Sequence, residues 1–216
     1  MRIRRIQAFP LAYPEPHYKG IERYITVARV ESDDGLVGWG ECISQFPEAT
    51  LATKVIIEQG FAPLLTGEDG LDVERLWQKM LDRIWWYGPE GIAAFAVSAV
   101  DMALWDLKGK ALGAPVCQLL GGQLHDRVTA MASIIFDMED IEWTVNEFRW
   151  LREEGYRVVK GGWGMRPEAV FGLDRTRDIE VVRLVRDVIG DGLELVVDTP
   201  GQRGLWDVPT AIQRFR

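Results

Sequence analysis

The second half of the chain alternates between strand-like and helix-like segments, and this pattern limits the possible folds more than any other feature. Short runs rich in Val, Ile and Leu predict strands, and longer segments with a helical period separate them. We predict strands over 128–136, 156–160 and 193–198, helices over 140–154 and 174–189, and a further helix beginning near Val208. Because these strands are almost continuously apolar, we expect a parallel sheet covered by helices.

Two architectures fit this alternation: a closed eight-unit barrel and an open doubly wound sheet. No Gly-x-Gly-x-x-Gly motif follows the first predicted strand, which argues against a dinucleotide-binding open sheet. A complete (β/α)8 barrel occupies about 250 residues, roughly 31 per unit, so residues 126–216 hold about three units. We therefore expect a partial (β/α)8 TIM-type barrel, apparently truncated: the N-terminal portion of a longer protein, a split product, or a chain that another chain completes.

The first half of the chain has a different pattern, typical of an α+β unit. Strand-like segments cover 2–9, 24–30 and 36–43, a Pro-rich loop is expected over 11–18, and Asp34-Gly35 predicts a hairpin turn. A three-stranded antiparallel meander followed by helices is the expected result. We place this α+β domain at residues 1–125 and the barrel segment at 126–216.

Three helices are expected after the meander, over 49–60, 72–86 and 90–110, with Pro63 and a Gly-rich turn separating the first two. The third helix is rich in small residues, which are Gly91, Ala93, Ala94, Ala96, Ser98, Ala99 and Ala103. Such a slim helix lets another element approach closely, so we expect it to form the packing centre of the domain.

Composition excludes several classes of protein. The net charge is −8, with acidic and basic residues interspersed, so nothing suggests a nucleic-acid or anionic-membrane partner. The longest apolar stretches fall short of the roughly 18 residues that span a bilayer. The first residues lead into an alternating segment and not into a long apolar one, so we expect no signal peptide. Cys42 and Cys117 are far apart in the sequence and follow no metal-binding spacing. We predict two buried thiols in a reducing compartment, and hence a cytoplasmic protein, in preference to the alternative of a disulfide.

Two ionisable residues close successive predicted strands. Lys160 ends the run Arg157-Val-Val-Lys, and Asp198 ends Leu195-Val-Val-Asp. An ionisable group after apolar β-branched residues is costly unless it is paired or bound to something. In a (β/α)8 barrel the active site lies at the C-terminal ends of the strands, so these two residues are candidates for one site.

The segment 99–122 reads A-V-D-M-A-L-W-D-L-K-G-K-x-x-G-x-P-V-x-x-L-L-G-G. It resembles the segment that joins the capping domain to the barrel in the mandelate racemase/muconate lactonizing enzyme branch of the enolase superfamily. That resemblance implies an α+β capping domain followed by the barrel. It also implies an enzyme that abstracts the proton alpha to a carboxylate and stabilises the resulting enediolate on Mg²⁺.

The same resemblance assigns roles to particular residues. Lys160 matches the first lysine of the family's Lys-x-Lys motif and would be catalytic, and Asp198 matches the first of three acidic metal ligands. Gly162 stands where the second lysine is expected and Pro200 where many members have Asn, which argues against a two-lysine racemase. The remaining ligands are expected beyond Arg216.

Substrate-binding candidates come from two regions. In the run Lys160-Gly-Gly-Trp-Gly-Met-Arg166, Gly162 leaves room for a ligand, and Trp163 and Arg166 can wall a pocket and pair with a carboxylate. Alternatively, the glycines only permit a tight turn after the strand. From the capping domain, the resemblance adds His17 and Phe46 as residues of specificity loops, although a histidine in a Pro-rich loop is more often simply solvated.

The resemblance favours a dehydratase of sugar acids, with a small-molecule carboxylate as substrate and a homo-oligomeric state. A racemase or cycloisomerase of another carboxylate in the same superfamily is the alternative enzyme. An alternative of another class is a non-catalytic fragment that serves folding or oligomerisation, because a single metal ligand does not hold Mg²⁺.

Overall fold

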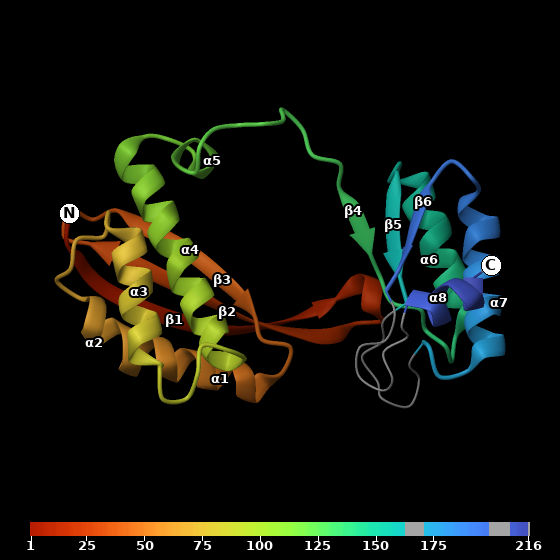
Figure 1. Ribbon diagram of the computed structural model, residues 1–216, viewed down its shortest axis with the longest axis horizontal. Coiled ribbons are helices and arrows are strands. Elements are labelled where there is room, and N and C mark those ends of the chain that lie inside the picture. Colours follow the sequence, from red (N-terminus) through yellow and green to blue (C-terminus); the bar gives the residue numbers. More distant parts are fainter. Residues whose placement is uncertain (163–170, 199–207, 216) are drawn as a thin grey trace. The chain divides into compact units, whose positions relative to one another are not determined.

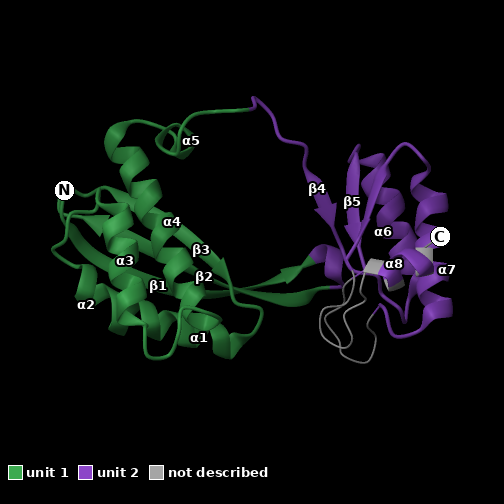
Figure 2. Ribbon diagram, in the orientation of Figure 1, with its two compact units in different colours: residues 1–15, 20–124 green, residues 16–19, 125–216 purple. Residues whose placement is uncertain are grey.

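The structure is a computed structural model that describes residues 1–162, 171–198 and 208–215. The chain forms two compact units (Figure 2). Unit 1 contains residues 1–15 and 20–124, and unit 2 contains residues 16–19 and 125–216. The short segment Pro16–Lys19 therefore belongs to the same unit as the C-terminal part of the chain.

Unit 1 opens with an antiparallel sheet of three strands in the order β1-β2-β3 (Figure 1). The strands are β1 (Ile3–Glu15), β2 (Ile21–Ser32) and β3 (Val37–Ile43). The predicted meander is present, but the predicted loop over 11–18 is wrong in its first part, because β1 pairs with β2 as far as Glu15 opposite Ile21. Proline is tolerated in β1 because β1 pairs with β2 on one side only, so an edge strand carries it.

Six helical segments follow the sheet. They are α1 (Pro47–Val55), η2 (Ile56–Phe61), α2 (Ala62–Leu65), α3 (Val73–Arg83), α4 (Ile92–Leu112) and α5 (Val116–Leu119). Pro63 does not separate two helices as predicted, since the chain stays helical from Pro47 to Leu65. It occupies the first turn of α2, where a missing backbone N–H breaks no hydrogen bond within that helix.

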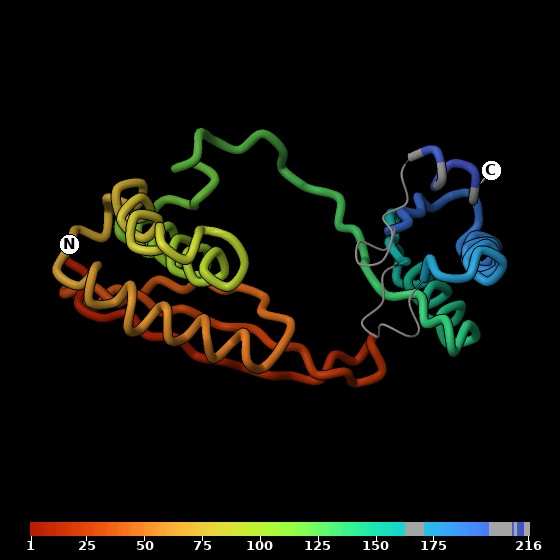
Figure 3. Tube along the Cα trace, turned by 60° about the horizontal axis from the view of Figure 1, so that its bottom comes forward, coloured from red at the N-terminus to blue at the C-terminus, as the bar shows by residue number. Residues whose placement is uncertain are grey.

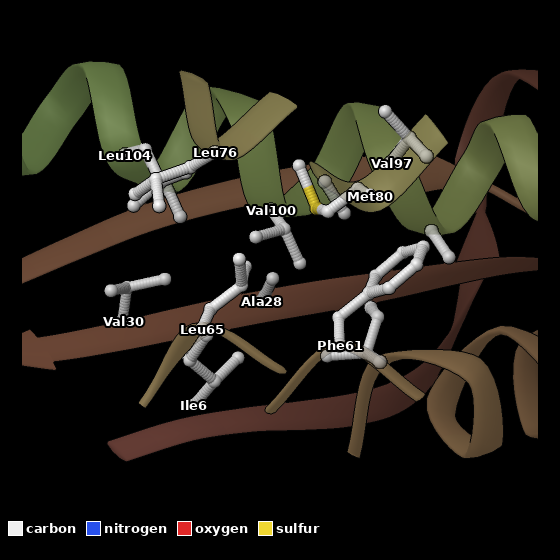
Figure 4. Close-up of a cluster of buried hydrophobic side chains, with 14 of the residues drawn as sticks. Ile6, Ala28, Val30, Phe61, Leu65, Leu76, Met80, Val97, Val100 and Leu104 are labelled. Atoms are coloured by element: carbon white, nitrogen blue, oxygen red, sulfur yellow. The ribbon is translucent and has the colours of Figure 1, made fainter. Parts of the chain in front are cut away.

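The core of unit 1 is formed by the sheet together with η2, α2, α3 and α4 (Figure 4). Gly38 and Gly40 of β3 lie directly against α4. A Cβ at Gly38 would be 2.0 Å from the Ala103 carbonyl oxygen, and one at Gly40 would be 2.2 Å from the Ala99 carbonyl oxygen. The expected close approach to a slim helix is thus confirmed, and glycine on β3 is as necessary to it as alanine on α4.

Unit 2 contains a parallel sheet with helices packed on it. Its elements are η1 (Pro16–Tyr18), β4 (Met131–Ser133), α6 (Ile141–Glu153), β5 (Val158–Gly161), α7 (Arg175–Ile189), β6 (Glu194–Val197) and α8 (Val208–Phe215). The strand order is β4-β5-β6 and both pairings are parallel. Helices α6 and α7 pack side by side (Figure 3). The predicted alternation is present, with a much shorter first strand.

Two further observations bear on the sequence predictions. Among the described residues, no helix combines the length and apolar character that crossing a membrane requires. Cys42 is buried, but Cys117 is exposed, so the prediction of two buried thiols is wrong for Cys117. The reason is local: Cys117 lies in the four-residue helix α5, which buries none of its residues.

Candidate functional site

The C-terminal ends of β5 and β6 bring Lys160 and Asp198 together. Lys160 pairs in register with Val196, and the amide of Asp198 donates a 2.7 Å hydrogen bond to the carbonyl of Gly161. The two side chains meet at the sheet edge, where Lys160 Nζ lies 2.7 Å from Asp198 Oδ2. Both side chains keep contact with solvent, with 27% and 38% of their surfaces exposed.

The pair lies on the face of the sheet that points away from the helices. In β5, Val159 and Gly161 are buried, and Gly161 abuts the ring of Phe136, which packs on Phe148 of α6. Because side chains alternate along a strand, Lys160 points to the opposite face. A ligand can therefore reach the Lys160–Asp198 ion pair, whereas Val159 and Gly161 are buried on the helix-covered face.

Glycine is required at the position where the family's second lysine is expected. Gly162 has a φ of +119°, which L side chains rarely adopt. A Cβ at this position would lie 2.4 Å from the carbonyl oxygen of Asp198 and 3.0 Å from its amide nitrogen. A side chain here would therefore push the backbone of the third strand away from that of the second.

A further residue at this edge, Ser133, was missed by the sequence analysis. Ser133 is the register partner of Lys160 in β4, it is exposed, and the amide of Ile134 donates a 2.9 Å hydrogen bond to the carbonyl of Lys160. The predicted strand extended to residue 136, which placed the wrong residue at its end. Recognising that β4 ends at Ser133 requires the register with β5.

Comparison with known proteins decides the family. A family model described as the mandelate racemase/muconate lactonizing enzyme N-terminal domain matches residues 17–121. The chain belongs to this family. The match confirms the N-terminal capping domain that the resemblance implied, and it covers residues 17–121 of the predicted range 1–125.

The curated relatives include enzymes that act on sugar acids and their lactones. D-galactarolactone cycloisomerase of Agrobacterium fabrum is 33% identical over 175 residues, which are 80% of this chain and 43% of the relative. Arabinonate dehydratase of Saccharolobus solfataricus is 33% identical and matches 81% of this chain and 44% of the relative. The chain thus spans less than half the length of these relatives.

Solved structures of the family extend over almost the whole chain. The 3,6-anhydro-D-galactonate cycloisomerase of Zobellia galactanivorans matches 99% of this chain and 54% of its own, with 28% identity and a TM-score of 0.82. A mandelate racemase/muconate lactonizing protein of Paracoccus denitrificans, complexed with magnesium, matches the same shares with 32% identity and a TM-score of 0.80.

The other predicted substrate-binding residues lie in different surroundings. His17 stacks on Trp150 of α6 with ring centroids 4.3 Å apart, and its Nδ1 lies 3.0 Å from Glu147 Oε2. Phe46 is the residue before α1 in unit 1 and is 61% exposed. Trp163 and Arg166 lie outside the described residues. The structure thus brings together Lys160, Gly162 and Asp198. The His17 ring instead contacts Trp150 and Glu147 of α6.

A second charged cluster is formed by Lys19 with Asp137 and Asp140, both in the loop between β4 and α6. Lys19 Nζ lies 2.7 Å from Asp137 Oδ2 and 3.0 Å from Asp140 Oδ2. Burial alone raises the pKa of Asp137, but hydrogen bonds from Lys19 and from the amides of Glu139 and Asp140 outweigh it, so the pKa is lowered. The Trp143 amide and Lys19 likewise lower the pKa of Asp140, which caps α6. Desolvation lowers the pKa of Lys19, but the hydrogen bonds and charges of Asp137 and Asp140 outweigh it, so the pKa of Lys19 is raised above its ordinary value.

Magnesium needs more ligands than the described residues supply. Asp198 offers hard carboxylate oxygens of the kind that Mg²⁺ binds. Within ranges 1–162, 171–198 and 208–215, however, no three His, Cys, Asp or Glu residues are grouped to hold a metal ion. One carboxylate that is already paired with Lys160 does not by itself fit the metal.

A cavity of about 560 Å³ in unit 2 lies elsewhere. Residues 127–130 and 154–157 line it, and these precede β4 and β5. It is therefore at the N-terminal ends of the strands, away from Lys160 and Asp198. Since the ionisable pair is at the other edge, we take the pair and not the cavity as the candidate site.

Proposed function

We propose that this chain carries the first part of an enolase-type active site that acts on a sugar acid. The single observation that carries the proposal is the meeting of Lys160 and Asp198 at adjacent strand ends, 2.7 Å apart. Relatives named arabinonate dehydratase and D-galactonate dehydratase support the substrate class. The proposed reaction is removal of water from a hydroxy-carboxylate after loss of the proton alpha to the carboxylate.

The proposal includes the architecture in which these residues work. Residues 126–216 are the first βα units of a (β/α)8 barrel that follows the capping domain at 1–125. Three parallel strands, each followed by a helix, support this, as does the match of 99% of the chain to 54% of a solved cycloisomerase structure. In such a barrel the strand ends bearing Lys160 and Asp198 form part of the mouth.

Lys160 has two possible roles in the proposed reaction. As a neutral amine it accepts the alpha proton, and as an ammonium it binds the substrate carboxylate while a residue of a later strand takes the proton. Asp198 would supply one of the carboxylate ligands of Mg²⁺ once acidic residues of later strands complete the set, and the bound ion would then stabilise charge on the substrate carboxylate. Because Gly162 cannot carry a side chain, this strand offers one amine only.

The experiment uses aldonic acids, such as arabinonate and galactonate, with Mg²⁺, and follows the 2-keto-3-deoxy product. We compare the wild type with Lys160→Met and Lys160→Arg, each in a protein that contains this chain together with the later strands of the proposed barrel. Loss of turnover by a factor on the order of 10³ or more in Lys160→Met is expected. Arginine retains the cation but is a poor base, so activity in Lys160→Arg assigns the carboxylate-binding role and its loss assigns the base.

Cycloisomerisation is the second candidate, because D-galactarolactone and 3,6-anhydro-D-galactonate cycloisomerases are among the relatives. Mass spectrometry separates the two reactions, since dehydration removes one water and cycloisomerisation leaves the mass unchanged. If that completed protein forms neither product and calorimetry detects no saturable binding of Mg²⁺ to it, the chain is a non-catalytic fragment and the proposal is wrong.

A further inference from the structure

Tyr18 is a buried side chain at one end of a hydrogen-bond path to Lys160. It closes the short turn Pro16–Tyr18, a part of unit 2, and only 4% of its surface is exposed. Its hydroxyl donates a 2.7 Å hydrogen bond to the carbonyl oxygen of Ser133, the last residue of β4. The hydroxyl of a buried tyrosine usually forms a hydrogen bond, and here it is formed with the carbonyl oxygen at the end of β4.

The peptide group that Tyr18 binds is the one that joins β4 to Lys160. Its carbonyl, from Ser133, accepts the Tyr18 hydroxyl, and its N–H, from Ile134, donates to the carbonyl of Lys160 at 2.9 Å. Ser133 is also the register partner of Lys160. One planar peptide therefore transmits the position of the Tyr18 ring to the backbone of Lys160.

The residues on either side hold Tyr18 in place. His17 stacks on Trp150 and lies within hydrogen-bond distance of Glu147, both in α6. Lys19 has a φ of 55°, uncommon for a residue with a side chain, and its ammonium is bound by Asp137 and Asp140. These contacts, like that of Tyr18, are all made with β4, α6 or the loop between them, so the segment is fixed to the first βα unit.

We propose that Tyr18 is a positioning residue for the Lys160 site. It sets the end of β4 against β5, and so fixes the height at which the Lys160 amine meets Asp198. The catalytic role of Lys160 rests on the proposed function. The hydrogen-bond path from Tyr18 to Lys160 does not, because it is made of contacts within unit 2. The segment Pro16–Lys19 thereby acts on the site through the backbone of β4, and this action does not require a contact between His17 and a substrate.

The test is nuclear magnetic resonance on Tyr18→Phe, which keeps the buried ring and removes the hydroxyl. Amide hydrogen exchange at Ile134 reports the hydrogen bond to Lys160, and the nuclear Overhauser effect between Lys160 Hε and Asp198 Hβ reports the pair. Tyr24→Phe is the matched control, because the Tyr24 hydroxyl also donates a hydrogen bond, at 2.6 Å to Glu22, but lies in unit 1.

Exchange at Ile134 should rise roughly three- to tenfold in Tyr18→Phe, as expected for one lost hydrogen bond, and the Lys160–Asp198 signal should weaken. Neither should change in Tyr24→Phe. A purely structural role would lower the melting temperature of Tyr18→Phe without these local changes, and that result overturns the proposal. If Tyr18→Phe does not fold, the wild type decides: a slowly exchanging Tyr18 hydroxyl proton coupled to the Ser133 carbonyl supports the path, and its absence refutes it.

Discussion

Gly162 lies so close to Asp198 that a Cβ at position 162 would be 2.4 Å from the Asp198 carbonyl oxygen. In unit 2 the chain at the end of β5 therefore approaches the chain at the end of β6 so closely that only glycine fits at position 162. In the family pattern this is the position of a second lysine. The absence of that lysine is thus accompanied by a backbone arrangement that its side chain would disrupt, which supports the prediction that this chain does not use two lysines.

Gly162→Ala should lower the free energy of unfolding of unit 2 by about 3 kcal/mol or more, because it adds a steric clash to the strain of a positive φ. Gly155→Ala is the control. Gly155 also has a positive φ, +86°, but nothing lies within 4 Å of its Cβ position, so it should lose only about 1–2 kcal/mol. Urea unfolding followed by amide resonances of unit 2 measures both. Equal losses would contradict the close approach.

Replacing either member of the Lys160–Asp198 pair should hardly affect stability. Both side chains are partly exposed, and ion pairs of this kind contribute up to about 1 kcal/mol. Lys160→Met and Asp198→Asn should therefore unfold within about 1 kcal/mol of the wild type in urea. A loss of several kcal/mol from either variant would indicate that the pair is a structural element of the sheet and not a site.

Unit 2 should lose stability in acid through the carboxylates that bind Lys19. The pKa values of Asp137 and Asp140 are lowered in the folded chain, so their contribution is present above the unfolded pKa of 3.8 and is lost as the pH falls through the folded values. Lys19→Met should cost about 1 kcal/mol at pH 7 and should flatten the fall below pH 4. Melting temperatures at pH 2 to 7 measure this.

Lys79→Met is the control for the Lys19 prediction, because Lys79 forms a comparable pair with Glu68 at 2.6 Å in unit 1. It should leave the pH dependence of unit 2 unchanged. The same sign applies to unit 1: hydrogen bonds from Lys79 and Arg75 lower the pKa of Glu68 to about 2, so its contribution is lost between about pH 4.5 and 2. If Lys19→Met shows the wild-type acid profile, the Lys19 pairs do not stabilise unit 2.

The two thiols should differ sharply in reactivity. Burial raises the pKa of Cys42 and removes it from solvent, whereas Cys117 is exposed. Titration of the native chain with a thiol-disulfide reagent should therefore label one cysteine rapidly and the second only after denaturant is added. In Cys117→Ser the rapid phase should disappear; a rapid phase that persists would place Cys42 at the surface.

Gly40→Ala should be among the most destabilising changes in unit 1, costing about 3 kcal/mol or more. A methyl group there would be 2.2 Å from the Ala99 carbonyl oxygen and 2.6 Å from the Ala103 amide, both in α4, so the strand and the helix would have to separate. Gly60→Ala is the control: it lies in the helical turn η2 with nothing within 4 Å, so it should be neutral or stabilising by up to about 1 kcal/mol.

Several parts of this structure follow from the sequence because they depend on local properties. Hydrophobic period distinguishes strands from helices, so the alternation after residue 127 and the parallel sheet are predictable. Lys160 and Asp198 are recognisable because an ionisable group directly follows an apolar run in each case. The motif over 99–122 is contiguous, so it indicates the family without any knowledge of the fold.

What depends on distant segments was decided only by the tertiary structure. The partners of His17 and Tyr18 are 130 and 115 residues away in the chain, and no local pattern predicts such contacts. Strand β1 continues through its prolines because it is an edge strand. Glycine is needed at position 162 because the chain after β5 lies close to the chain after β6. Local sequence sets the type and period of each element, whereas register and close contact arise from packing between elements that the sequence places far apart.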